Sequence, residues 1–165
     1  MEAQHEYRVH AFGAGGRNGV VQAQGVLSSI SFSAPPEFLG EPGRWTPEHF
    51  FVAALASCFV STFSGIAEKS RLNFASFNLE AEGLLSNADG VWRFKEIRLR
   101  PVVTIPNEGA RDRVIQLLEK AEKSCLIARS LQCKVVLFPA VKIERGIVCP
   151  SKNLKNAPRQ KISDR

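Results

Sequence analysis

The feature that most constrains the fold is a long stretch without a charged side chain, from Phe50 to Ala67. Its length is close to that of a membrane-spanning helix. However, it contains several small or polar residues that lower its hydropathy (Ser57, Ser61, Thr62, Ser64 and Gly65), and no polybasic segment flanks it. We therefore expect a central core helix that is apolar on nearly all sides and buried, and no membrane association.

The residues before this stretch predict where the helix begins. Thr46 is a good N-cap, Pro47 suits the first helical position, and Glu48 complements the helix dipole in the first turn. We expect one helix that runs from there to about Lys69.

Shorter elements are expected on both sides of this helix. Strands are predicted before it over residues 7–12, 20–24 and 26–32. A Gly-rich turn over residues 13–19, which contains the hairpin signal Asn18-Gly19, is expected to join the first two. After it, residues 77–82 and 91–105 alternate as strands, and a phase slip at Lys95-Glu96 predicts a β-bulge.

The last third of the chain predicts two helices and a strand. Asn107 is expected to cap a helix over residues 108–123, and Ser124 to cap a short helix that begins at Cys125. A strand follows over residues 134–138. Because strands and helices do not alternate regularly, the fold class is predicted to be α+β.

The length of 165 residues fits a single domain, expected over residues 1–141, followed by a basic C-terminal tail over residues 142–165. Of the net charge of +6, the tail carries +5, from seven Lys or Arg against Glu144 and Asp164. A short basic tail without aromatic residues is typical of a solvated terminus. Nucleic-acid binding is therefore not expected, although a structural or nucleic-acid-associated protein that uses this tail remains an alternative.

The four cysteines are Cys58, Cys125, Cys133 and Cys149. The N-terminus lacks the pattern of a signal peptide, so a cytoplasmic setting with reduced thiols is expected. No CxxC pair is present, and the three histidines do not complete a zinc pattern. We therefore expect catalytic or buried thiols, and neither a metal nor a cofactor.

Reactive cysteines need a thiolate and a second thiol within reach. Cys58 lies within the apolar helix, where burial raises the pKa of a thiol, so its position alone favours an inert core residue. Cys125 opens a helix and follows Lys120 and Lys123, and both features favour a thiolate. Cys133 is expected to be a packing residue, and Cys149 an exposed thiol in the tail.

Two motifs in register resemble the family of osmotically inducible protein C and organic hydroperoxide resistance proteins, OsmC/Ohr. The run from Thr46-Pro47-Glu48 to Ser57-Cys58-Phe59 is similar to the helix that carries the family's first cysteine. The run from Ser124 to Leu131 resembles its second-cysteine motif, with Leu126 in place of the usual proline. The resemblance covers roughly residues 5–141 and points to a less defined OsmC-like subgroup.

This resemblance implies an intertwined homodimer with antiparallel sheets around a long buried central helix. It also implies a thiol-dependent peroxidase, an antioxidant oxidoreductase that reduces organic hydroperoxides and hydrogen peroxide. Cys58 would become the sulfenic acid, Cys125 would resolve it as a redox-active disulfide, and a dithiol donor would reduce that disulfide. Glu48 would fix a catalytic arginine. A binding or regulatory relative with little turnover is the main alternative.

The arginine has two candidates. Arg17 follows Gly15-Gly16, as in the Ohr branch, and is favoured; in the OsmC branch the corresponding arginine precedes the long helix, where this chain has Glu37. Arg44, or no dedicated arginine, is the other possibility. The phenylalanines of the helix are expected either to pack in the core or to line an apolar pocket (Phe50, Phe51, Phe59 and Phe63).

Helix geometry adds a prediction about assembly. Ten residues of helix advance about 15 Å and leave two side chains about 80° apart around the axis, so Glu48 and Cys58 of one chain cannot share an arginine. Two copies of the helix packed antiparallel could bring Glu48 of one chain to Cys58 of the other. We therefore expect a homodimer with composite active sites.

Overall fold

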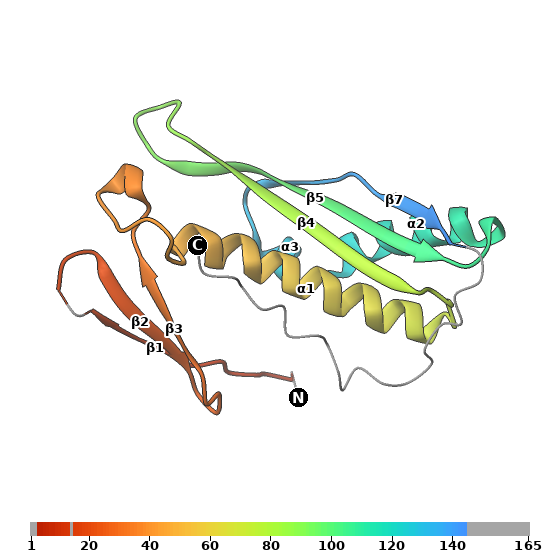
Figure 1. The fold of residues 1–165 in the computed structure, drawn as a ribbon, viewed down its shortest axis with the longest axis horizontal. Coiled ribbons are helices and arrows are strands. Elements are labelled where there is room, and N and C mark those ends of the chain that lie inside the picture. The colour runs from red at the N-terminus through yellow and green to blue at the C-terminus, as the bar shows by residue number, and fades with distance from the viewer. Residues whose placement is uncertain (1–2, 14, 145–165) are drawn as a thin grey trace.

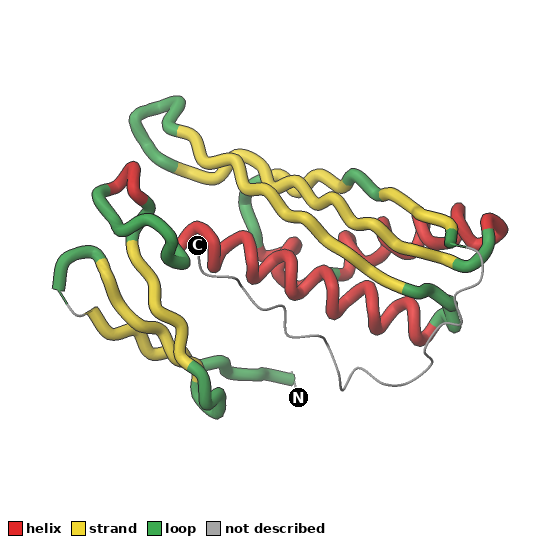
Figure 2. The backbone as a smooth tube through the Cα atoms, in the orientation of Figure 1, coloured by secondary structure: helices red, strands yellow, loops and turns green. Residues whose placement is uncertain are grey.

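The computed structural model describes residues 3–13 and 15–144, which form two β-sheets and one long helix between them (Figures 1 and 2). The N-terminal sheet is antiparallel and contains β1 (Val9–Gly13), β2 (Asn18–Ala23) and β3 (Ser29–Ser33). The larger sheet contains β4 (Ser76–Ser86), β5 (Arg93–Ile105), β6 (Lys134–Leu137) and β7 (Ala140–Ile143). The helices are α1 (Pro47–Lys69), α2 (Arg111–Ser124) and α3 (Leu126–Ser130), and two 3-10 turns span Pro36–Phe38 and Glu108–Ala110. The predicted α+β class is confirmed.

The long helix α1 begins where the sequence predicts. The Thr46 hydroxyl accepts a hydrogen bond from the backbone N–H of His49, and the His49 ring accepts one from the N–H of Thr46. Pro47 occupies the first turn, Glu48 adds its carboxylate there, and the helix ends at Lys69. This reciprocal cap satisfies two backbone groups at the start of the helix.

In the larger sheet, β5 is the central strand. It pairs antiparallel with β4 along one edge, and β6 and β7 follow each other along its other edge, both parallel to it. Leu84 of β4 pairs with Glu96 of β5, and the next residue, Leu85, pairs with Phe94. Lys95 of β5 is therefore the extra residue of a bulge. The β-bulge predicted at Lys95-Glu96 is therefore confirmed.

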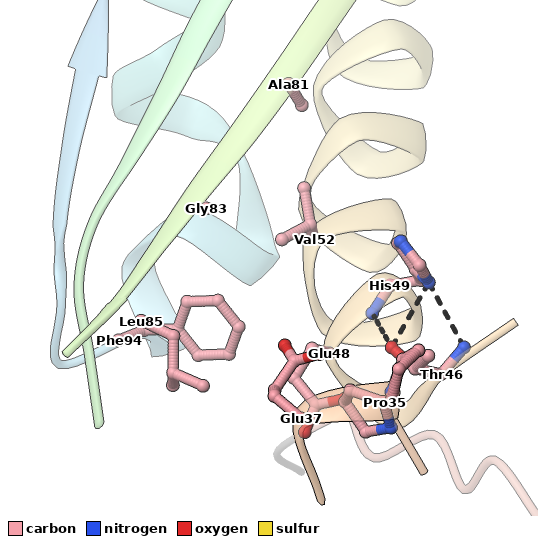
Figure 3. A pocket seen from close by; sticks show the side chains of 11 residues that line it. Pro35, Glu37, Thr46, Glu48, His49, Val52, Ala81, Gly83, Leu85 and Phe94 are labelled. Atoms are coloured by element: carbon pink, nitrogen blue, oxygen red, sulfur yellow. Dashed lines mark hydrogen bonds between the residues drawn. The ribbon is translucent and has the colours of Figure 1, made fainter. Parts of the chain in front are cut away.

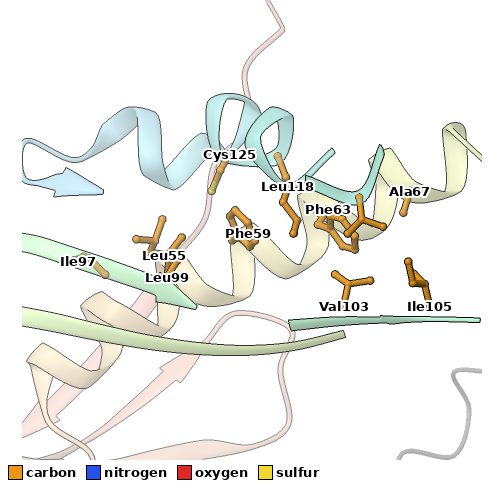
Figure 4. Close-up of a cluster of buried hydrophobic side chains, with 12 residues drawn as sticks. Leu55, Phe59, Phe63, Ala67, Ile97, Leu99, Val103, Ile105, Leu118 and Cys125 are labelled. Carbon is orange, nitrogen blue, oxygen red and sulfur yellow. The ribbon is translucent and has the colours of Figure 1, made fainter. Parts of the chain in front are cut away.

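The hydrophobic core lies between this sheet and the three helices. Every second residue of β5 from Ile97 to Ile105 points inward, as expected for a strand with one buried face. These residues meet one face of α1 and the inner face of α2 (Leu55, Phe59, Phe63, Ala67, Val114, Leu118 and Ala121), and Cys125 closes the cluster (Figure 4).

The prediction that α1 is buried on nearly all sides is wrong for the single chain. Only Leu55, Phe59, Phe63 and Ala67 are buried, and only 22% of its most apolar window is buried. By length and composition this helix could cross a membrane, a test that core helices of soluble proteins also pass. The sheet and α2 cover a single face, so small residues remain exposed along the other face (Ala54, Ser57, Ser61 and Ser64).

The N-terminal sheet stands apart from this core (Figure 1). Several of its large apolar side chains are exposed, with Val9 at 61%, Phe12 at 60% and Ile30 at 42%. The turn between β1 and β2 uses Gly15 and Gly16, which take the positive φ that the turn requires. The turn therefore lies inside the Gly-rich segment where it was predicted, whereas the hairpin signal Asn18-Gly19 already belongs to β2.

The helices after β5 also differ from the prediction in detail. Asn107 makes no side-chain cap, and a 3-10 turn precedes α2, which begins at Arg111. The short helix after α2 begins at Leu126, and Cys125 itself is its N-cap residue. Cys149 and most of the predicted tail lie outside the described residues.

Candidate active site

The fold brings two of the predicted site residues together. Cys58 lies in the middle of α1 and is half-buried, whereas Cys125 lies between α2 and α3 and is fully buried. The two thiols interact directly, and each changes the pKa of the other. Residues far apart in the chain thus form a cysteine pair at the junction of three helices.

The pKa of the Cys58 thiol lies below its ordinary value. Burial raises this pKa, but hydrogen bonds from the backbone of Ile127, the Cys125 thiol, the Thr62 hydroxyl and the backbone of Leu126 lower it and together outweigh burial. A sulfur that receives several hydrogen bonds is stabilised as a thiolate. Cys58 is therefore the more nucleophilic member of the pair.

The pKa of the Cys125 thiol is raised. Burial is the main cause. A hydrogen bond from the Ala128 backbone opposes it, and the neighbouring Cys58 raises the pKa further. The prediction of a Cys125 thiolate is therefore wrong. Lys120 and Lys123 are exposed to solvent, where their charge is screened, and the expected electrostatics of the two cysteines are reversed.

Sequence reasoning missed Thr62 and the backbone groups of α3. The Thr62 hydroxyl lies 4.0 Å from the Cys58 sulfur, one helical turn further along α1. The spacing of four residues could have indicated this contact, because such side chains lie on one face of a helix. The contacts of Cys58 with α3 depend on packing between segments that are distant in the chain, so no local sequence pattern predicts them.

Glu48 lies beside a pocket of about 500 Å³ between the start of α1 and the larger sheet (Figure 3). Apolar side chains from both elements line it, together with the carboxylates of Glu37 and Glu48. One carboxylate oxygen of Glu48 is buried, and it has no hydrogen-bond partner among the described residues. A buried acceptor without a partner is costly, so this end of α1 is incomplete in one chain.

Neither candidate arginine completes the site within one chain. The Arg17 guanidinium donates to the carbonyl of Phe38, and Arg44 forms an ion pair with Glu41 at 3.5 Å. Among the described residues, no hydrogen bond or ion pair joins either arginine to Glu48 or to Cys58.

The remaining predicted residues have structural positions. Phe59 and Phe63 are core residues, whereas Phe50 stacks on Trp45 and Phe51 stacks on Phe94 at the edge of the pocket. Cys133 packs partly buried against the core, and burial raises its pKa. In the portion of the chain with described coordinates, no three metal-ligating side chains gather into a group.

Comparisons with known proteins agree with this arrangement. A family model described as OsmC-like protein matches residues 40–137, which include both cysteines and Glu48. The uncharacterized protein YmaD of Bacillus subtilis is 31% identical over 150 residues, which are 87% of this chain and 98% of that protein.

Solved structures show the same fold. An OsmC-like protein of unknown function from Vibrio cholerae has a TM-score of 0.73 at 26% identity, covering 82% of this chain and 99% of that one. The organic hydroperoxide resistance protein OhrB of Bacillus subtilis has a TM-score of 0.62 at 19% identity, and the match covers 85% of this chain and 100% of that one. The latter likeness concerns the fold alone.

Proposed function

The chain belongs to the OsmC-like protein family, and from this membership we propose that it is a thiol-dependent peroxidase that reduces organic hydroperoxides at Cys58. The observation that carries the proposal is the cysteine pair. One thiol has a lowered pKa, and it lies beside a second, buried thiol with a raised pKa. A nucleophile beside a resolving thiol is the arrangement that a two-cysteine peroxidase needs.

The proposed cycle has three steps. The Cys58 thiolate attacks the outer peroxide oxygen, the O–O bond breaks, and the alkoxide leaves and takes a proton to become an alcohol. The Cys125 sulfur then attacks the Cys58 sulfenic acid, the S–S bond forms, and water leaves with the thiol proton. A dithiol donor supplies two electrons and two protons and restores both thiols. Because Cys125 is buried and protonated beside Cys58, it is held ready for the second step.

We assign the missing part of the site to a second copy of the chain. The exposed face of α1 carries small residues that allow two helices to approach closely, and the N-terminal sheet exposes large apolar side chains. Antiparallel packing of two α1 helices would bring the Glu48 pocket of one protomer to Cys58 of its partner. The homodimer with composite sites is thus part of the proposal.

The pocket suits an organic hydroperoxide more than a small polar one. Its walls include the apolar side chains of Val52, Leu85 and Phe94, which can contact an alkyl or aryl group. In the dimer, Arg17 remains our preferred partner for Glu48, since its turn contacts the Pro36–Phe38 segment beside the pocket. The proposed setting is the cytoplasm, where dithiol donors are reduced.

A binding or regulatory role is the alternative, and the observation that favours it is the position of the two candidate arginines. Neither Arg17 nor Arg44 contacts Glu48 or Cys58 within one chain. A protein with this cysteine pair but no positioned arginine could bind or sense hydroperoxides with little turnover. The two functions differ in the rate at which the protein consumes peroxide.

The test is consumption of cumene hydroperoxide with dithiothreitol or a dihydrolipoyl donor. We expect multiple turnovers in the wild type and none in Cys58→Ser. After one equivalent of peroxide, the intact mass should fall by about 2 Da, and the loss should map to a Cys58–Cys125 disulfide. Cys125→Ser should instead keep a sulfenic acid on Cys58. Slow oxidation without turnover would favour the binding or regulatory role.

A further inference from the structure

The hydroxyl groups of α1 do not all behave alike. Ser57 donates to the carbonyl of Ala54 at 3.2 Å, and Ser61 donates to the carbonyl of Ser57 at 2.9 Å. Such bonds to the preceding turn are ordinary for serine within a helix. Thr62 instead contacts the Cys58 sulfur at 4.0 Å, at the length limit for a hydrogen bond to sulfur.

The position of Thr62 fits this contact. It lies four residues after Cys58, on the same face of α1, and it is half-buried. Cys58 therefore has Thr62 along its own helix and the first residues of α3, together with Cys125, across the junction. The sulfur lies between two sets of donors.

All of these donors are neutral. The groups that favour the Cys58 thiolate are two backbone amides, the Cys125 thiol and the Thr62 hydroxyl, and no charged side chain of the described residues is among them. Cys125 loses its thiol when the disulfide forms. Among side chains of the same chain, Thr62 is then the hydrogen-bond donor that remains unchanged throughout the cycle.

We propose that Thr62 is a further catalytic residue, whose hydroxyl donates a hydrogen bond to the Cys58 thiolate and holds the sulfur toward Cys125. Thr62 exchanges no atom and keeps its proton, so the balance of the peroxidase steps is unchanged. The effect on peroxide reduction rests on the proposed function, whereas donation to the thiolate does not depend on it.

The experiment compares Thr62→Val, Thr62→Ala and Thr62→Ser in the full chain. Valine keeps the shape and removes the hydroxyl, whereas serine keeps the hydroxyl. The rate of iodoacetamide alkylation is measured against pH and mapped to Cys58 by peptide mass. One hydrogen bond to a charged group has an effect of about tenfold on such an equilibrium, so Thr62→Val and Thr62→Ala should raise the midpoint by about one pH unit. Thr62→Ser should stay close to wild type.

Ser61→Ala is the matched control, because it removes a hydroxyl from the neighbouring position that donates to the backbone. Its alkylation midpoint should not move. An unchanged midpoint in Thr62→Val and Thr62→Ala would overturn the proposal, as would an equal shift in Thr62→Ser, since that would identify the lost methyl contact as the cause.

A second measurement separates this inference from the proposed function. Single-turnover oxidation of Cys58 by cumene hydroperoxide at pH 7 should be about three- to tenfold slower in Thr62→Val than in wild type. If no variant reacts with peroxide but the alkylation midpoints shift as expected, the peroxidase proposal fails and the donor role of Thr62 stands. If peroxide is reduced and no midpoint shifts, only the donor role fails.

Discussion

In α1, Cys58 lies in the middle of the helix against α3, and Glu48 lies in its first turn beside a pocket. Among the described residues, the groups that lower the pKa of Cys58 are backbone and side-chain donors of its own chain. Glu48, in contrast, has a buried carboxylate oxygen without a partner among the described residues, and the two arginine candidates contact other groups. Folding of one chain thus supplies hydrogen-bond donors to Cys58, whereas in the proposed dimer a second copy would supply the partner that Glu48 lacks.

The two residues differ because different segments of the chain pack against the middle and against the start of α1. Around Cys58, α3 begins where its backbone amides point at the helix, so folding of one chain supplies the donors. Around Glu48, the walls come from β4, β5 and the Pro36–Phe38 turn, which contribute apolar side chains and another carboxylate. The thiolate of Cys58 should therefore survive separation of the protomers, whereas peroxide turnover should not.

The largest expected effect comes from placing charge on the exposed face of α1. Ala54→Glu combined with Ser64→Glu puts two carboxylates where we expect the partner helix, and burying unpaired charges opposes association. Peroxide consumption should fall by about a hundredfold or more, because each composite site loses half of its residues. Analytical ultracentrifugation should show a monomer.

The control for this variant is Gln116→Glu, on the exposed side of α2. This variant should remain a dimer and should consume peroxide at the wild-type rate. The alkylation midpoint of Cys58 should be the same in all three proteins, since its donors lie in one chain. A fully active monomer would show that the Glu48 region does not need a partner.

Mixed dimers test which chain supplies each residue. Glu48→Gln and Cys58→Ser are each expected to be nearly inactive alone. If Glu48 of one protomer serves Cys58 of the other, a mixed dimer has one intact site, and random mixing should restore about a quarter of the wild-type activity. The measurement is peroxide consumption after the two variants are unfolded and refolded together. No recovery would place both residues in a site within one chain.

The pH dependence follows from the pKa shifts of the pair. The thiolate is the nucleophile, and the pKa of Cys58 is lowered by hydrogen bonds despite burial. Single-turnover oxidation should therefore rise with pH to a midpoint below that of an unperturbed cysteine thiol, and fall about tenfold per pH unit below that midpoint. Stopped-flow fluorescence measures this rate.

Cys125→Ser sharpens the same measurement. The Cys125 thiol helps to lower the pKa of Cys58, and a serine hydroxyl at this buried position has a different reach. The oxidation midpoint should shift, and Cys125 in the wild type should ionise only at higher pH, since burial and Cys58 raise its pKa. A wild-type midpoint at or above that of cysteine in a short unstructured peptide would contradict the donor arrangement around Cys58.

The smallest expected effect concerns the charge of the substrate. Glu37 and Glu48 line one pocket, and Glu37 is exposed at its edge, so an anionic hydroperoxide should be repelled. Cumene hydroperoxide with a para-carboxylate should react more slowly than its methyl ester. Glu37→Gln should raise the acid-to-ester rate ratio roughly threefold, the effect of one charge at moderate distance in water.

Glu80→Gln removes the same charge from the exposed side of β4 and controls for net charge. It should leave the acid-to-ester ratio unchanged. Added salt should weaken the discrimination in the wild type, because exposed charges are screened. Equal rates for acid and ester at low salt would mean that the substrate does not enter beside Glu37.

Much of the fold could be predicted from local patterns. The cap at Thr46, the extent of α1, the alternation in β5 and the bulge at Lys95 all depend on neighbouring residues, and the structure confirms them. The Gly-rich turn between β1 and β2 is also where it was predicted, although Gly15 and Gly16 supply its positive φ and Asn18-Gly19 lies within β2.

The pairing of Cys58 with Cys125 could be predicted from the sequence, but the pKa shifts of the two thiols could not. The motifs around Cys58 and Cys125 were sufficient to place the chain in its family, and Glu48 was found through the same helix. Which thiol has the lowered pKa depends on the burial of Cys125 and on the donors that α3 presents to Cys58. These donors are distant in sequence.

The sequence by itself thus determined the α+β class, the long capped helix and the two family cysteines, because caps, periodicity and motifs act between residues close in the chain. The tertiary structure decided which cysteine has the lowered pKa and that one face of α1 remains uncovered. Both outcomes depend on which distant groups pack against a residue, and burial and hydrogen bonding at such contacts set the pKa of a thiol.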